Sequence, residues 1–270
     1  MTRRIAASLA ALVLLCATTL AAHDLFLKPA SYFVRPHGDV QVSVLNGTFT
    51  TSENAITRDR ILDVSLVGPD GRQRIDTARW TDAGTKSVIS LRVGAPGTYV
   101  VGASLKPREL SLAGAEFSAY LTEEGIDEVV AARTHAGTAA DSARERYSKH
   151  VKALLQVGDA GSNDYQAVLG YPAEIVPLDN PYTARLGGTV RVRCLVDGKP
   201  AAGVTVLAGG RTPGGERFAV QRAVADADGA ARVRLDTRGQ YYVKFIRMVE
   251  VSGGPVDYES KWATLTFAVR

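Results

Sequence analysis

The sequence predicts a mainly β protein built from two β-sandwich domains, with a short two-helix insertion between them. Apolar and polar residues alternate with a period of two over many short segments, and turns such as Gly68-Pro69-Asp70-Gly71 separate these segments at short intervals. Gly97-Thr98-Tyr99 and Gly239-Gln240-Tyr241 both follow a turn and open an alternating segment, which indicates an internal repeat. Short strands separated by frequent turns are typical of sandwiches.

Residues 1–22 have the pattern of a secretory signal peptide. Arg3 and Arg4 precede an apolar run that ends at Ala21 and Ala22. The run is shorter than the ~20 residues that a membrane-spanning helix needs. We therefore expect a periplasmic or secreted protein that does not itself span the membrane once processed. Cleavage after Ala22 makes His23 the first residue, and cleavage after Ala21 makes it the second.

The strands fall into two groups. The first group belongs to a predicted N-terminal sandwich at residues 23–120, with alternating segments at 40–44, 62–67, 88–93 and 98–101. The second belongs to a predicted C-terminal sandwich at residues 161–270, with segments at 190–196, 203–207, 231–235, 241–245 and 262–269.

Residues 121–160 form the predicted helical insertion and linker. The first helix is expected at residues 122–133, because Thr122 is a good N-cap and acidic residues follow it. The second is expected at residues 141–155, where Tyr147, Val151 and Leu154 recur at helical spacing.

The composition excludes some classes of function. The chain has 32 Lys and Arg against 28 Asp and Glu, and two of the arginines lie in the leader. The net charge of the processed chain is thus about +2, and no basic cluster alternates with aromatic residues, which argues against nucleic-acid binding. Cys194 is the single cysteine outside the leader. It shares a face with valines, so we expect a buried apolar residue rather than a reactive thiol.

His23 is the strongest candidate for chemistry. As the first residue it would offer an α-amine and a ring nitrogen to one metal ion, and Asp24 would add an oxygen. Such donors suit copper(II), nickel(II) or zinc. The alternative interpretation is that His23 only begins the strand that contains Leu25 and Leu27.

Any further ligands must be brought together by the fold, because no HxxxH, HxH or CxxC spacing occurs. His37, in a turn near the first strand, and His150, beside the predicted helical stripe, are the supporting candidates. Glu174 and Asp179 are weaker acidic candidates. We find no GxSxG motif, phosphate-binding loop or spaced carboxylate pair, so the sequence makes no case for an enzyme.

Six segments together resemble one family of exported bacterial proteins. They are residues 23–29 (HDLFLKP), 121–126 (LTEEGI), 144–152 (RERYSKHVK), 170–181 (GYPAEIVPLDNP), 197–204 (DGKPAAGV) and 259–267 (ESKWATLTF). The set is similar to a domain of unknown function that is often labelled NikM-like, for periplasmic components associated with nickel or cobalt uptake. The resemblance covers essentially the whole processed chain.

The resemblance implies immunoglobulin-like sandwiches and supports His23 as the histidine that follows the leader in this family. Members often carry a histidine before the methionine that follows the Gly-x-Tyr strand. The corresponding residues here look like Arg247 and Met248, so this chain lacks that histidine.

Our favoured hypothesis is an exported, non-enzymatic protein that binds a nickel, cobalt or copper ion through His23, Asp24 and one of His37 or His150, as an accessory to a membrane metal-uptake component. The alternative is an envelope module that binds carbohydrate or protein without metal. Its binding surface would consist of exposed aromatic residues, namely Tyr165, Tyr171, Tyr182 and Tyr258. A copper oxidase with an N-terminal histidine brace is a third hypothesis, and it requires a second histidine facing the first.

Overall fold

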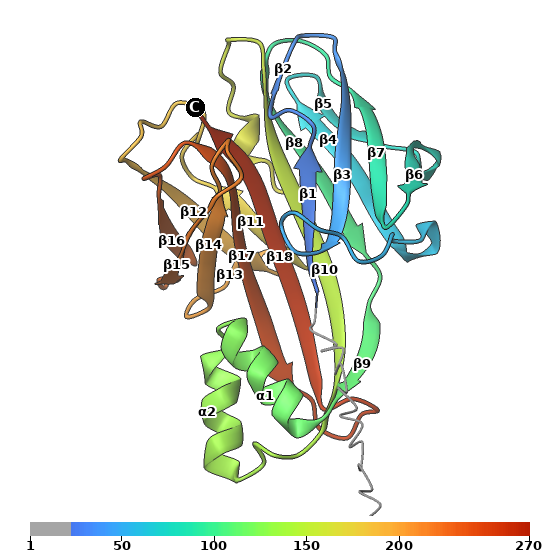
Figure 1. Cartoon of the computed structure of the whole chain (residues 1–270), viewed down its shortest axis with the longest axis vertical. Helices are drawn as coiled ribbons and strands as arrows, with labels where there is room; N and C mark the ends of the chain where they lie inside the picture. Colours follow the sequence, from blue (N-terminus) through green and yellow to red (C-terminus); the bar gives the residue numbers. More distant parts are fainter. Residues whose placement is uncertain (1–22) are drawn as a thin grey trace, which may run out of the picture.

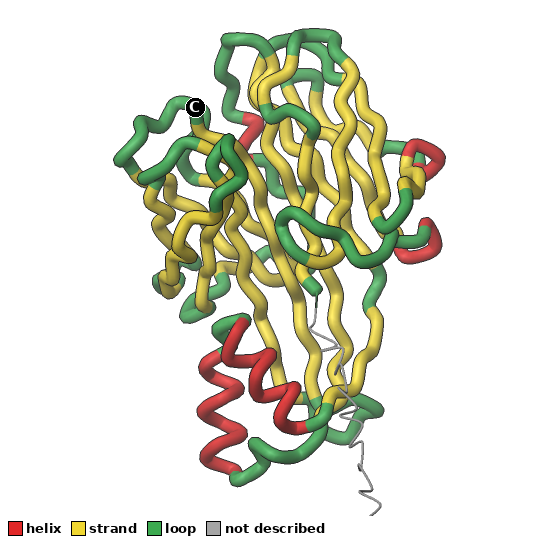
Figure 2. Tube along the Cα trace, in the orientation of Figure 1, coloured by secondary structure: helices red, strands yellow, loops and turns green. Residues whose placement is uncertain are grey.

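A computed structural model describes residues 23–270 of the protein; the predicted signal peptide lies outside the described residues. Within this range the chain forms three β-sheets and two α-helices (Figures 1 and 2). The strands are β1 (Asp24–Pro29), β2 (Phe33–Val34), β3 (Asp39–Gly47), β4 (Ile61–Gly68), β5 (Gly71–Arg74), β6 (Trp80–Ala83), β7 (Lys86–Arg92), β8 (Gly97–Leu105), β9 (Arg108–Leu112), β10 (Ala143–Val157), β11 (Ala173–Pro177), β12 (Thr189–Val196), β13 (Lys199–Pro200), β14 (Thr205–Arg211), β15 (Arg217–Val224), β16 (Ala230–Arg234), β17 (Gly239–Glu250) and β18 (Tyr258–Val269). The helices are α1 (Gly114–Glu123) and α2 (Asp127–Ala136).

Two sandwiches share one large sheet. A sheet of order β1-β3-β7-β6 packs on β4, β8 and β10, and a sheet of β11, β12, β13 and β16 packs on β14, β17 and β18. Alternation along the strands builds each core: Val42 and Val44 of β3 point into the first, and Val192 and Cys194 of β12 into the second. Cys194 is fully buried, as expected, and burial raises the pKa of its thiol.

The shared sheet has ten strands and runs through both halves of the molecule. Its main path is β15-β14-β17-β18-β10-β8-β4-β5. β10 joins the halves, because it pairs with β18 in parallel and with β8 in antiparallel orientation. Leu154 of β10 packs into the second core and its neighbour Leu155 into the first. The division of the chain at residues 23–120, 121–160 and 161–270 stays a prediction.

The second predicted helix, at residues 141–155, is wrong: this segment is the long strand β10. Cores lie on both faces of β10, so apolar residues occupy both and the period of two disappears from the sequence. Tyr147, Val151 and Leu154 then match a helical spacing by coincidence. A strand buried on both faces cannot be distinguished from a helix by periodicity alone.

The predicted helix at residues 122–133 is instead two helices separated by a turn. Gly125 has a φ of 71°, a left-handed conformation in which glycine ends α1 before α2 begins. Phe117 and Leu121 of α1 pack with Ile246 and Met248 of β17. The helices therefore cover one end of β17 and β18, at the bottom of Figure 1.

The internal repeat forms the same local structure twice. Tyr99 Oη donates a hydrogen bond to the carbonyl of Ala95 at 2.8 Å, and Tyr241 Oη donates to the carbonyl of Thr237 at 2.6 Å. Both tyrosines lie two residues after the glycine that begins a strand, and both bonds reach back four residues. Tyrosine corners of this type are a feature of immunoglobulin-like sandwiches. The prediction of a mainly β fold of immunoglobulin-like sandwiches with two helices is confirmed, although the helices have other bounds than predicted.

Candidate functional site

A cavity of about 730 Å³ lies where both sandwiches meet the helices. Its walls come from the start of β1, the loop that follows β3, helix α1 and the β14–β15 hairpin. These segments are far apart in the sequence, and pairing of β1 with β3 sets Asp24 opposite Gly47, where the loop begins. Cavities of this size are typical of small-molecule sites.

Aromatic rings form the apolar wall of the cavity. Phe26 of β1 and Phe49 of the following loop have ring centroids 5.4 Å apart, and Tyr242 of β17 lies 5.3 Å from Phe26 and 5.2 Å from Phe49. The three rings pack with the buried Leu45. They give the cavity a preformed apolar surface from two separate sheets.

A buried ionic cluster forms part of the cavity lining. Lys244 Nζ donates to Asp24 Oδ2 and to Glu124 Oε2, each at 2.6 Å. Burial and the nearby Asp24 carboxylate raise the pKa of Glu124 to about 7, against the pull of Lys244. Burial opposes the charge of Lys244, but the two carboxylates outweigh it and hold the pKa of the lysine above its usual value.

A second layer of charges lies behind this cluster. Lys149 Nζ donates to the carbonyl of His23, and burial lowers its pKa to about 8. Glu145 accepts a hydrogen bond from Tyr120 Oη at 3.2 Å, and burial raises the pKa of this carboxyl. Within residues 23–270, Asp24 Oδ1 and Glu145 Oε2 are buried without a hydrogen-bond partner. Buried polar atoms without partners are uncommon and call for an explanation.

His23 lies in the lining, at the edge of the buried cluster. Its Nε2 is 2.9 Å from Glu53 Oε2, and the histidine side chain is 23% exposed against 52% for the glutamate. His23 and Asp24 therefore do line one site, although Asp24 is committed to Lys244.

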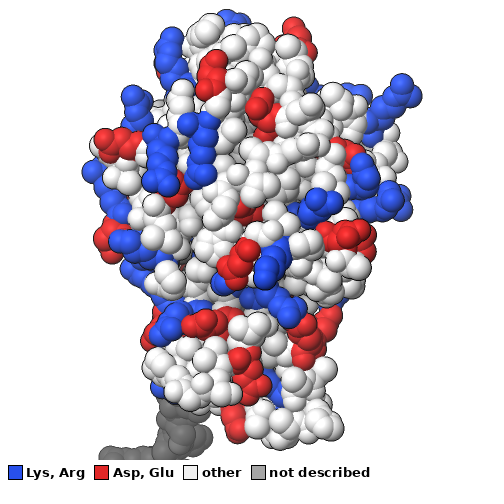
Figure 3. Space-filling model, turned by 180° about the vertical axis from the view of Figure 1, so that it is seen from behind, with Lys and Arg blue, Asp and Glu red and all other residues white. Residues whose placement is uncertain are grey.

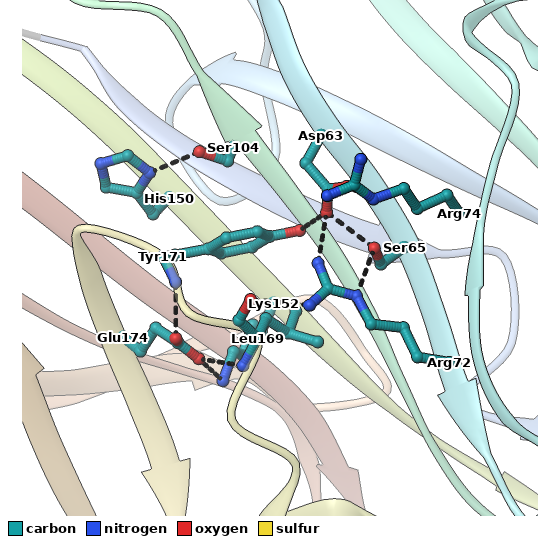
Figure 4. A network of polar contacts seen from close by, with 10 residues as sticks. All are labelled: Asp63, Ser65, Arg72, Arg74, Ser104, His150, Lys152, Leu169, Tyr171 and Glu174. Carbon is teal, nitrogen blue, oxygen red and sulfur yellow. Dashed lines mark hydrogen bonds and ion pairs between the residues drawn. The ribbon is translucent and has the colours of Figure 1, made fainter. Parts of the chain in front are cut away.

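The other two predicted ligands lie elsewhere. His37 is exposed in the turn between β2 and β3, with a φ of 57°. His150 is buried on β10, where Ser104 Oγ lies 2.8 Å from Nδ1 (Figure 4). On its other side, Ser148 Oγ lies 3.0 Å from Nε2. Burial lowers the pKa of His150 to about 3. Its neighbour Lys149 contacts His23, so the strand pleat points His150 to the opposite face.

The structure thus does not bring His23, Asp24, His37 and His150 together. In the part of the chain that the structure describes, no three side chains of His, Cys, Asp or Glu lie close enough to hold a metal ion. The weaker acidic candidates also have partners: Glu174 forms an ion pair with Lys152, and Asp179 forms one with Arg191.

The expected exposed aromatic surface is wrong as well. Tyr165, Tyr171 and Tyr258 are buried, and Tyr182 is half-buried. Tyr171 Oη donates to Asp63 Oδ2 at 2.6 Å, and Figure 4 shows that this contact joins the segment before β11 to β4 of the first sandwich. Tyr165, Tyr171 and Tyr182 pack in the second core, and Tyr258 packs against Phe117 of α1. Their rings supply apolar area while each hydroxyl finds a polar partner.

The sequence analysis missed most of the residues that line the cavity, among them Phe49, Glu53, Glu124, Arg211 and Lys244. Lys244 carried a usable signal, because a lysine between valine and phenylalanine in a predicted inner strand needs a buried partner. The others belong to loops and strand ends, whose positions depend on tertiary structure.

No helix within residues 23–270 combines the length and apolar character needed to cross a bilayer. The chain matches a family model described as a domain of unknown function, DUF4198, over residues 20–248. No curated protein matches the chain.

Several solved structures show low similarity. A tetra-tandem repeat from the extending region of a large adhesion protein has 11% identity and a TM-score of 0.24, with 91% of this chain and 49% of that chain covered, so this chain spans about half its length. A segment of two fibronectin type-III domains from chicken tenascin has 11% identity and a TM-score of 0.23, with 92% and 99% covered. A native alpha-2-macroglobulin segment from Escherichia coli has 11% identity and a TM-score of 0.22, with 88% and 69% covered.

Proposed function

The chain belongs to the DUF4198 family, and from this premise we propose that it is an exported, non-enzymatic binding protein whose ligand lies in the cavity between β1, α1 and the β14–β15 hairpin. One observation carries the proposal: a cavity of about 730 Å³ combines a preformed aromatic wall with charged groups. Ligand sites typically combine a largely apolar lining with a few placed polar groups. The leader-like residues 1–22 support export.

A cavity-filling substitution tests this proposal. Ala115 and Ala119 are exposed on α1 and line the cavity, so Ala115→Trp or Ala119→Trp would fill it without disturbing a core. The probe is anilinonaphthalene sulfonate, an aromatic anion whose fluorescence rises in apolar sites. We expect saturable binding to the processed protein and its loss in either variant.

Ala132→Trp is the matched control, because Ala132 is exposed on α2 and does not line the cavity. Its probe binding should equal that of the unchanged protein. Saturable binding that persists in both cavity variants would overturn the proposal, as would the absence of saturable binding.

A transition-metal site at His23 is the second candidate, with nickel, cobalt or copper as the ion and a membrane uptake component as the partner. The contact between His23 Nε2 and Glu53 supports it. Histidine ligands commonly donate their second ring N–H to a carboxylate, which fixes the tautomer and leaves the other nitrogen free for metal. Here Nδ1 and, after cleavage at Ala22, the α-amine would form the chelate.

Equilibrium dialysis against Ni(II), Co(II) and Cu(II) tests the metal site on a protein that begins at His23. His23→Ala should abolish stoichiometric binding, and a protein that begins at Ala22 should bind more weakly because the α-amine no longer belongs to the histidine. Glu53→Gln should weaken binding about 10- to 100-fold. Binding that His23→Ala leaves unchanged would eliminate this candidate.

A further inference from the structure

The charges that line the cavity are separated along its length. Positions along strand β17 give the separation between the two ends of the cavity. Arg211 is opposite Gln240 of this strand, and Leu207 is opposite Lys244. Further along, Ile246 packs with helix α1. At a rise of about 3.3 Å per residue, the six intervals from Gln240 to Ile246 span roughly 20 Å. On the face of the molecule seen in Figure 3, basic and acidic side chains are instead intermixed.

One end of the cavity is cationic. Arg211 and Arg217 are paired across the β14–β15 hairpin, and both line the cavity. Arg211 contacts the carbonyl of Gly215 and Thr50 Oγ1, the latter at 3.4 Å. Neither arginine has a carboxylate partner within residues 23–270. Two guanidinium groups without an acidic partner form a suitable site for a carboxylate.

The other end is acidic. Glu116 and Glu123 of α1 line the cavity, and their spacing of seven residues places them on one face of the helix. Neither forms an ion pair with another described residue. Nearby, Lys244 contacts two carboxylates, and the buried Asp24 Oδ1 has no hydrogen-bond partner in residues 23–270. This end has the excess negative charge that an ammonium group requires.

The middle of the cavity is apolar and flat. Tyr242 of β17 is opposite Gly209 of β14. A Cβ atom at Gly209 would lie 2.5 Å from Tyr242 Oη, so glycine is what allows the tyrosine ring to lie across the strand. Phe49 packs against this ring, and the exposed side chain of Val220 extends the apolar lining.

We propose that the cavity binds a short peptide with free termini, its ammonium group near Glu116 and Glu123, its carboxylate at Arg211 and Arg217, and its apolar side chains on the ring of Tyr242. The proposal rests on the function proposed above and names the class of ligand. An extended chain covers at most about 3.5 Å per residue, so the separation of roughly 20 Å fits about five or six residues.

Titration calorimetry with the pentapeptide Ala-Leu-Phe-Leu-Ala tests this inference. The probe is used with free termini, with an acetylated N-terminus and with an amidated C-terminus. We expect each modification to weaken binding about tenfold or more, since each removes a charge-assisted hydrogen bond. The free peptide should also displace anilinonaphthalene sulfonate.

Variants assign each terminus to its end of the cavity. Arg211→Gln combined with Arg217→Gln should weaken binding of the free peptide about tenfold or more, and amidation should then cause no further loss. Glu116→Gln combined with Glu123→Gln should likewise weaken binding of the free peptide, and acetylation of the N-terminus should then cause no further loss. Arg232→Gln and Glu250→Gln are the controls, because both residues are exposed away from the cavity, and these variants should bind all three peptides as the unchanged protein does.

Equal affinity for the free, acetylated and amidated peptides would overturn the inference. So would a variant in which modification of the corresponding peptide terminus still weakens binding as much as it does in the unchanged protein. A free peptide that fails to bind overturns it too. If the dye is still excluded by Ala119→Trp in these cases, the cavity remains a binding site and only the class of ligand is wrong.

Discussion

Among residues 23–270, Lys152 and Lys244 each form a buried cluster with carboxylates, and of these two clusters the one at Lys244 lines the cavity. Lys152 of β10 pairs with Glu174 of β11, and both side chains are at most 3% exposed. Lys244 of β17 meets Asp24 and Glu124 in the lining of the cavity. Both lysines project from inner strands of the same sheet, so strand position alone does not explain the difference.

The difference is whether the cluster is complete. Glu174 accepts backbone N–H bonds from Leu169 at 2.9 Å and Tyr171 at 2.7 Å, and Lys152 also donates to the carbonyl of Ala167 at 3.1 Å. Figure 4 shows Glu174 surrounded by these donors. One positive charge there meets one negative charge.

The cluster at Lys244 is incomplete by the same measures. Lys244 contacts two carboxylates at once, and Asp24 Oδ1 has no hydrogen-bond partner among residues 23–270. A complete cluster stabilises the packing of strands. An incomplete one at a cavity leaves charge for a ligand to satisfy.

The largest effect that would test this contrast is expected at the complete cluster. Glu174→Gln keeps the shape of the side chain but leaves Lys152 buried without a counter-charge. Removing one partner of a buried ion pair typically costs about 3–5 kcal/mol of stability. We expect a loss of that size in the free energy of unfolding, measured by urea denaturation.

Glu259→Gln is the matched control, because Glu259 pairs with Arg146 while 43% exposed. Exposed pairs contribute about 0–1 kcal/mol, so its effect should be small. If Glu174→Gln lowered the free energy of unfolding no more than this control, the fully paired cluster at Lys152 would not stabilise the fold in the way we infer.

The next effect concerns pH at the incomplete cluster. The pKa of Glu124 is raised from 4.5 to about 7 in the folded protein, so folding takes up a proton between these values. The stability linked to this proton is fully present below pH 4.5 and is lost as pH rises through 7. Glu124→Gln removes the titration. Its stability relative to the unchanged protein should therefore rise by about 3 kcal/mol between pH 4.5 and pH 8.

Urea denaturation of both proteins across this pH range measures the effect. Other titrating groups are shared by the two proteins, so they largely cancel in the difference. If the difference in stability between the two proteins did not depend on pH, Glu124 would be ionised throughout this range. The folded protein would then take up no proton at this cluster.

The sequence predicts the sandwiches well because one-sided strands keep a period of two, as in 40–44 of β3. It fails at β10, where two cores remove the alternation. The tyrosines at positions 99 and 241 are predicted as equivalent because the turn, the glycine and the tyrosine are all local.

The cavity could be predicted only in part. His23 and Asp24 were singled out by their place after the leader, and both do line the cavity. Their partners Glu53 and Lys244 are 30 and 220 residues away along the chain, and only the pairing of β1 with β3 and the packing of β1 near β17 bring them close. Long-range contacts of this kind leave no local pattern.

The smallest effect on stability is expected for Asp24→Asn, which separates the two causes of the raised pKa of Glu124. Burial is the larger cause and the negative charge of Asp24 the next. Asparagine keeps the shape of the side chain and removes the charge, so the pKa of Glu124 should fall toward its ordinary value. The free energy of unfolding at neutral pH should change by less than about 1 kcal/mol. Lys244 still forms its ion pair with Glu124, and the repulsion between the two carboxylates disappears.

Carbon-13 NMR titration of the glutamate carboxyl groups measures this change. Asp39→Asn is the control, since Asp39 pairs with Arg92 on the exposed surface of the first sandwich. If the pKa of Glu124 stayed at about 7 in Asp24→Asn, burial alone would set it. The two clusters would then differ in access to the cavity rather than in balance of charge.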